Sequence, residues 1–268
     1  MKGGDDLIDN IPINNELVNK VYDDTLKETA KESSGLLALI PRYIKSKLFN
    51  FRVNLLISEH NYEVVQSLIS NECKTIDPDK LVTPEAYVAM PALNAISYSM
   101  EAQELRDMYA KLLSKAMYSG TKDSVHPAYV EIIKQMSPLD ANILKLFIDT
   151  NVYAITKYLA GGEDNTVTSL FENMFLEYPR EKNQYAIATS ISNLQRLGLL
   201  EITYEMPLST TIEYEEHFKT DIYKEFEASI KNKEQGKMDK IIVDKGLLLR
   251  TPLGTSFMLV CILPIDYK

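Results

Sequence analysis

Three residue types on which enzymes often rely are scarce in this sequence. Its 268 residues include no tryptophan, two cysteines and three histidines. Cys73 and Cys261 lie far apart and form no CxxC pair, which excludes a zinc site of that type. His60, His126 and His217 are also far apart, and no HExxH motif is present. The sequence therefore lacks the common histidine and cysteine signatures of a metal enzyme.

Long hydrophobic runs are missing as well. The N-terminal residues 1–18 contain no apolar core of the kind found in a signal peptide. The longest apolar patch in this part of the chain, GLLALIP, ends at Pro41 and is too short to cross a bilayer. We therefore expect a cytoplasmic protein with reduced cysteines and no transmembrane segment.

Positive charge is in deficit. The chain carries 29 Lys and Arg against 38 Asp and Glu, a formal net charge of -9. An acidic protein repels DNA phosphates and anionic lipids unless a local basic patch overrides its field. A hydrophobic share of 45% beside 25% charged residues predicts a packed core rather than disorder. The length allows two domains.

Helical periodicity dominates the first half of the chain. Residues 1–15 are polar and are expected to be flexible, and amphipathic helices are expected over 16–33 and 41–59. Three prolines within 78–91 exclude one continuous helix there, so a helix should restart near Pro91. The clearest helix should be capped by Ser99. Its predicted buried stripe is Leu105, Met108, Tyr109, Leu112, Leu113 and Ala116.

Residues 124–147, SVHPAYVEIIKQMSPLDANILKLF, contain two helix-start signals. Pro127 suits the first position of a helix, where its missing N–H is no loss. Ser137, followed by Pro138 and Asp140, resembles a capping box that begins the next helix. Both prolines and Asp140 are thereby explained by helix starts.

His126 and Glu131 remain unexplained by helix starts. They are five residues apart and do not share a helix face. We interpret His126 as a side chain that hydrogen-bonds across a helix junction. A hydrolase or nuclease is the enzymatic alternative, and its polar candidates would be Glu101, Glu104, Arg106, His126 and Glu131.

The last third of the sequence changes character. Helices are expected over 168–175 and 184–197, and strands over 199–206 and 241–251. Thr251 with Pro252 should open a final helix. Two helices followed by two strands predict a winged helix, so the fold class is mainly α with a small antiparallel sheet.

This pattern divides the chain into a helical domain over 16–136 and a winged-helix-like domain over 137–268, with an insertion at about 207–238. The insertion is acidic, with seven acidic residues against four lysines between positions 207 and 236. Hydrophobic residues recur in it every four positions, which predicts an amphipathic helix. Its candidate partner-contact residues are Tyr214, Phe218, Ile222 and Phe226.

A DNA-binding function needs basic and amide side chains on the recognition helix. The outer face of the expected helix 184–197 and the residues just before it offer few of them, and the candidate DNA contacts are Lys182, Asn193 and Arg196. DNA readers normally combine several base contacts with phosphate contacts. Nucleic-acid binding is therefore disfavoured by the residues as well as by the net charge.

Residues 91–145 carry a longer pattern. It consists of Pro91–Ala92–Leu93, Glu104–Leu105–Arg106, Leu112–Leu113, His126–Pro127, Glu131–Ile132–Ile133–Lys134 and Ser137–Pro138–Leu139–Asp140. This pattern resembles the Abi-alpha family, which is linked by name to abortive infection, a bacterial response to phage. Weaker similarity runs from about residue 40 to TPLGTSFMLVCI. The resemblance implies a bacterial or prophage origin and a defence role, and it supplies no catalytic residues.

These observations favour a non-enzymatic protein without a cofactor, which acts through a protein partner or a homo-oligomer in phage defence. The alternative is a winged-helix DNA-binding regulator, which a prophage could encode. The enzyme hypothesis is the third, because the sequence contains no evident pairing of a nucleophile with a base.

Overall fold

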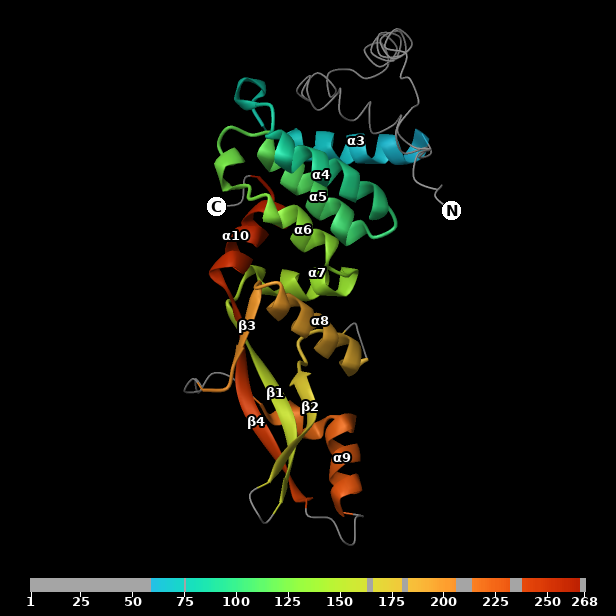
Figure 1. The fold of residues 1–268 in the computed structure, drawn as a ribbon, viewed down its shortest axis with the longest axis vertical. Helices are drawn as coiled ribbons and strands as arrows, with labels where there is room; N and C mark the ends of the chain where they lie inside the picture. The colour runs from blue at the N-terminus through green and yellow to red at the C-terminus, as the bar shows by residue number, and fades with distance from the viewer. Residues whose placement is uncertain are drawn as a thin grey trace, which may run out of the picture.

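The computed structural model describes residues 59–74, 76–162, 166–179, 183–205, 214–231 and 238–265. Figure 1 shows an elongated molecule with helices gathered at one end, the sheet at the other, and α7 and α8 between them. The fold is mixed α+β, with a four-stranded antiparallel sheet. The helices expected over 16–33 and 41–59 lie outside the described residues, apart from Glu59, which begins α3.

The helical end consists of α3 (Glu59–Cys73), α4 (Ala86–Tyr98), α5 (Gln103–Ala116) and α6 (Ala128–Lys134). The stripe predicted for α5 is confirmed, because all six of its residues are buried. Ser99 was assigned wrongly: it follows the last residue of α4, and α5 begins at Gln103. Pro91 lies inside α4 rather than at its start.

Short 3-10 turns complete this end of the molecule: η2 (Pro78–Lys80), η3 (Lys122–Ser124) and η4 (Leu146–Ile148), the last of which follows α7 (Pro138–Lys145). The capping box predicted for α7 is confirmed. The Asp140 backbone N–H donates to Ser137 Oγ over 3.1 Å, and the Ser137 N–H donates to Asp140 Oδ2 over 2.6 Å.

The sheet has the strand order β2-β1-β4-β3, and every neighbouring pair is antiparallel. Its strands are β1 (Val152–Gly162), β2 (Val167–Met174), β3 (Leu200–Thr203) and β4 (Met238–Arg250). The long central pair β1–β4 runs in register from Val152 opposite Leu249 to Gly161 opposite Lys240. β1 was not predicted, although its Val, Tyr, Ile and Thr residues are typical of a strand.

The helix predicted over 168–175 is wrong, because these residues form most of β2. Two extra residues in β2 explain the error. Phe171 pairs with Tyr158 and Met174 pairs with Thr156, so three positions in β2 oppose two in β1, and a second shift lies between Ser169 and Phe171. Such bulges bring Phe171 and Met174, three apart, into one buried cluster. That spacing mimics the helical period.

The other elements expected in the last third are confirmed. α8 (Gln184–Arg196) leads into β3, and Thr251 caps α10 (Pro252–Cys261) by accepting the N–H of Gly254 over 2.8 Å. The insertion contains η5 (Glu215–Lys219) and α9 (Asp221–Lys231), which Thr220 separates. A winged helix would have a helix before α8, and the two would form a helix-turn-helix. In this protein β2 occupies the position of that first helix, so the helix pair is absent.

The main core is continuous from α3 to α10 and includes Ile155 of β1 and Leu248 of β4. After the sheet, α10 returns to the helical end and packs on α5, as Figure 1 shows. The division at 136/137 stays a prediction. Among the described helices, none is both long and apolar enough to span a bilayer.

Candidate functional site

His126 lies where the chain turns into α6. Its Nδ1 accepts the N–H of Ala128 over 3.1 Å, which holds the ring against the start of α6. The ring centroid is 5.9 Å from that of Tyr129. Pro127 precedes the first residue of α6 with φ −60°. This pair of residues therefore builds the start of a helix.

A cleft of about 500 Å³ opens beside His126, between the end of α5, η3, the start of α6 and the end of α10. Burial raises the pKa of the Tyr129 hydroxyl at its wall, and the nearby Ser256 opposes this shift. The residues that line it are Lys115, Thr121, Asp123, Ser124, Val125, His126, Tyr129, Ser256, Leu259, Val260, Pro264 and Ile265.

Lys115 is a buried lysine on the wall of this cleft. Its Nζ donates to the carbonyl of Leu259 in the last turn of α10. A cation in that position interacts favourably with the negative end of the helix dipole. Lys115 follows Met108 by seven residues and Leu112 by three, so its spacing places it on the buried stripe of α5. Its contact with the end of α10 was not predicted from the sequence.

The two cysteines do not supply a nucleophile. Both are fully buried and unbonded to each other. Burial, with a smaller contribution from Glu72, raises the pKa of Cys73 to about 12. Burial raises the pKa of Cys261 well above its ordinary value, against the weaker effect of Lys115. Both thiols therefore stay protonated near neutral pH.

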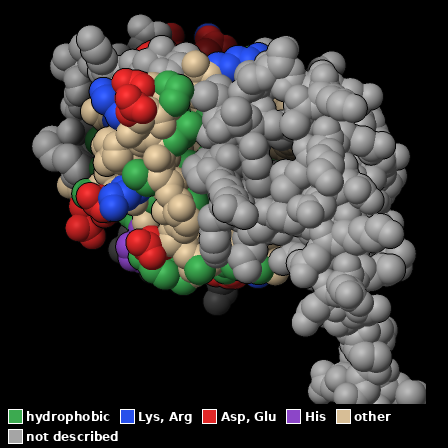
Figure 2. Space-filling view, turned by 90° about the horizontal axis from the view of Figure 1, so that it is seen from above, with side chains coloured by type: hydrophobic (Ala, Val, Ile, Leu, Met, Phe, Trp, Pro, Cys, Tyr) green, Lys and Arg blue, Asp and Glu red, His purple; other side chains and the backbone are tan. Residues whose placement is uncertain are grey.

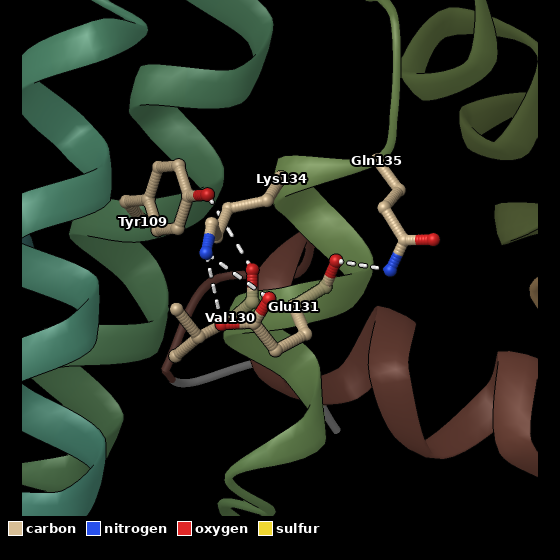
Figure 3. Close-up of polar contacts among 5 residues, drawn as sticks. All are labelled: Tyr109, Val130, Glu131, Lys134 and Gln135. Carbon is tan, nitrogen blue, oxygen red and sulfur yellow. Dashed lines mark hydrogen bonds and ion pairs between the residues drawn. The ribbon is translucent and has the colours of Figure 1, made fainter.

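Glu131 belongs to the outer face of α6, not to the cleft. Its carboxylate forms an ion pair with Lys134 at 3.1 Å, and its carbonyl accepts from Gln135 Nε2 over 3.0 Å. Figure 3 shows these contacts together with the Tyr109 hydroxyl, which donates to the carbonyl of Val130 over 3.4 Å. These interactions are internal to α6 or attach it to α5.

Glu104 and Arg106 lie in the first turns of α5. Glu104 Oε1 accepts from Asn142 of α7 over 3.0 Å, and Arg106 Nη1 donates to the carbonyl of Met100 over 2.6 Å. A backbone N–H first, and the Asn142 amide second, lower the pKa of Glu104. Neither side chain lines the cleft of His126. Of the five residues of the enzymatic alternative, only His126 lines this cleft.

Asp140, which forms the capping box with Ser137, and Gln135 just before it meet two residues of α8. Asn193 Nδ2 donates to Asp140 Oδ2 over 2.9 Å and to the carbonyl of Gln135 over 2.8 Å. Arg196 reaches Gln135 Oε1 over 2.9 Å, and its Nη2 donates to Asn193 Oδ1 over 2.7 Å. We name this network of Gln135, Ser137, Asp140, Asn193 and Arg196 the α7–α8 joint.

The α7–α8 joint bears on the candidate DNA contacts. Asn193 and Arg196 already hold the α6–α7 turn, and Lys182 lies outside the described residues. Gln135 is the member that sequence reasoning missed, since nothing in the sequence marks the end of α6 as a contact for α8. Figure 2 shows the helical end of the molecule from above, and on its described part acidic and basic side chains are intermixed with hydrophobic ones.

The candidate partner contacts lie in the segment 214–231, which we name the strap. Tyr214 is 5% exposed, and its hydroxyl donates to the carbonyl of Gly246 over 2.8 Å. Ile222 and Phe226 are half-buried against the cluster of Tyr158, Phe171 and Met174. Phe218 is 40% exposed. The stripe therefore attaches the strap to the sheet, and Phe218 is its accessible member.

No group of three His, Cys, Asp or Glu side chains arranged to share a metal ion occurs among the described residues. The protein belongs to the α+β class: its helices, with α10 packed back on α5, are joined to a curled antiparallel sheet. Several networks of polar side chains hold these elements together. The sequence model of the abortive infection alpha family matches residues 58–261. The chain belongs to this family, as the resemblance of residues 91–145 predicted.

No curated protein and no solved structure matches the chain. The α7–α8 joint and the strap lie within the family match, as do all residues that line the cleft except Pro264 and Ile265. The match ends at Cys261, the last residue of α10.

Proposed function

We propose that this protein acts in the bacterial cytoplasm as an abortive-infection factor that works through protein contacts rather than catalysis. The observation that carries the proposal is the family match over residues 58–261, which spans most of both the helices and the sheet. The separate structural roles of Glu104, Arg106, His126 and Glu131 support the non-enzymatic part.

The defence role is tested by challenging a bacterial culture that expresses the protein with several phages, at low and high infection ratios. We expect survival at the low ratio and collapse of the culture at the high ratio, since abortive infection sacrifices infected cells. Equal lysis with and without the protein at both ratios, for every phage, would refute the proposal.

The contact mechanism is tested at Phe218. Because this side chain is exposed on the strap, Phe218→Ser should weaken association with a partner or a second copy without changing the fold. Light scattering after size exclusion measures the association, and circular dichroism measures the fold. The matched control is Lys219→Ser at the next exposed position. Association that is equal in all three proteins would count against a contact role for the strap.

One observation favours the DNA-binding regulator as a second candidate. The strand order β1-β4-β3, with α8 leading directly into β3, suits a winged helix in which β2 takes the position of a helix. A labelled-DNA shift at low salt tests it, because electrostatic binding is strongest there. A shift that Arg196→Glu abolishes would support this candidate, and no shift at low salt would eliminate it.

A further inference from the structure

Within the strap, α9 is less deeply buried than the other long helices of the protein. No residue of α9 from Asp221 to Ile230 is fully buried, whereas α5 buries nine of its residues. Its apolar side chains contact a small cluster around Tyr158, Phe171 and Met174, which is separate from the main core. The strap can therefore open locally while the main core stays packed.

The firm attachment is at η5. The hydroxyl of Tyr158 in β1 donates a hydrogen bond to the carbonyl of His217, and the same hydroxyl lies 3.0 Å from Thr220 Oγ1. Tyr214 binds the carbonyl of Gly246 in β4. His217 itself is 3% exposed. These contacts place one buried histidine at the centre of the attachment.

The imidazole of His217 is poorly suited to carry a charge. Both ring nitrogens are buried and lack a hydrogen-bond partner of ordinary geometry among the described residues. Burial lowers the pKa of His217, while the nearby carbonyls of Met174 and Tyr214 act weakly in the opposite direction. An imidazolium without a partner in such a site is much less stable than one in water.

The surrounding charges do not compensate. Glu215 and Glu216 of η5 are exposed, and Glu216 pairs with Lys219 at 2.6 Å. From β4, the ammonium of Lys245 lies 5.3 Å from the Tyr214 ring and has the same sign as an imidazolium. Lys157 of β1 pairs with Asp244 of β4 at 3.0 Å, Lys224 pairs with Asp221 within α9 at 3.6 Å, and Glu172 of β2 accepts a hydrogen bond from Ser169. Burial raises the pKa of the Tyr158 and Tyr214 phenols, which are therefore neutral near pH 7.

We propose that the strap is a proton-sensitive cover: protonation of His217 releases residues 214–231 from the sheet and uncovers the apolar surface of Tyr158, Phe171 and Met174. Release returns the imidazole to water, where its pKa is about 6.5. Below that pH the released state binds a proton that the covered state does not, so each unit of fall favours release by up to about tenfold.

Hydrogen exchange of the full chain tests the proposal, at about pH 7.5 and about pH 5.5, one unit on either side of the ordinary imidazole pKa of about 6.5. After correction for intrinsic rates, protection of residues 221–231 should fall about tenfold at the lower pH, and protection of α5 should not change. Unchanged protection of the strap would overturn the proposal.

Variants identify the titrating group. His217→Phe and His217→Gln should abolish the pH effect on the strap, whereas Glu216→Gln should retain it. A fall of the same size in the His217 variants would overturn the proposal. The pKa of His217 can also be measured in the unaltered protein, from the pH dependence of exchange of the imidazole C2 hydrogen. A value at or above the ordinary pKa would equally overturn the proposal.

The inference rests on the proposed function only for the use of the uncovered surface, which would become available to a protein partner. The two can fail separately. Acid release in a protein that gives no protection against phage refutes the defence role alone. Protection against phage by a protein whose strap does not respond to pH refutes the cover alone.

Discussion

At the scale of single residues, Asn193 is the centre of the α7–α8 joint. Its amide group donates to Gln135 and Asp140, and its carbonyl oxygen accepts from Arg196. Asp140 is 2% exposed, so each lost partner leaves a buried carboxylate less well satisfied. The stability of the joint therefore depends on this one side chain.

Asn193→Ala should lower the free energy of unfolding by about 1–3 kcal/mol, because it leaves the carboxylate of Asp140 with one partner fewer. Urea unfolding measures the change. Gln195→Ala, at an exposed position of the same helix, is the control and should change stability by less than about 0.5 kcal/mol. Equal values for the two variants would contradict a structural role for the joint.

Sequence reasoning found part of this joint and misjudged the rest. The Ser137–Asp140 capping box is a local pattern, so the residues alone were enough to predict it. Asn193 and Arg196 were expected to face outward. Their actual contacts depend on where the α6–α7 turn docks, and docking is a tertiary property that helical periodicity does not encode.

The buried thiols give a second prediction at this scale. Cys73 and Cys261 should react with iodoacetamide only after denaturation, because burial blocks access and keeps both thiols protonated. Mass spectrometry of protein labelled near pH 8, with and without denaturant, checks this. Rapid labelling of either cysteine in the native protein would contradict the observed burial.

At the scale of elements, close packing at the start of α10 fixes where this helix lies against the chain before β3. A Cβ on Gly254 would lie 2.1 Å from the carbonyl oxygen of Leu199, which belongs to the backbone before β3. The hydroxyl of Thr251 also donates to the carbonyl of Gly198 over 2.6 Å. α10 therefore begins against the chain that enters the sheet, with no room for a side chain.

Gly254→Ala should destabilise the protein by more than about 1 kcal/mol, although alanine favours a helix by about that amount over glycine. The methyl group would push α10 away from Leu199. Thermal unfolding measures the loss. Thr255→Ala, which removes a methyl group and a hydroxyl bonded to the carbonyl of the N-cap residue Thr251, is the control. A higher melting temperature for Gly254→Ala would show that the clash is absent.

The elements differ in how well the sequence predicted them. α5, α8, β4 and α10 follow regular periods, and α8 and α10 also have standard caps, so each was predicted within a few residues. β2 was not, because its two bulges replace the period of a strand with spacings of three. A single sequence carries no marker for such an irregularity, since it is set by the partner strand.

At the scale of the whole molecule, the main core connects both halves of the chain. Val65 of α3, Ile143 of α7 and Val260 of α10 belong to one cluster of buried residues. The core therefore crosses the predicted boundary at 136/137. Neither half would bury its own apolar surface completely without the other.

We expect one cooperative thermal transition for the main core, because a shared cluster couples its parts. Calorimetry and far-UV circular dichroism check this, and the calorimetric and van't Hoff enthalpies should agree. Two separated transitions, with helix lost in one and sheet in the other, would instead support two domains that fold independently.

The return of α10 to α5 also has a consequence during synthesis. Lys115 and its partner Leu259 are 144 positions apart. The part of α5 that packs on α10 consequently stays open to water until the ribosome has delivered almost all of the described chain, although α3, α4, α6 and α7 can cover the rest earlier. Contacts of such long sequence separation form slowly, so this surface of a nascent chain should need shielding by chaperones until α10 has been made.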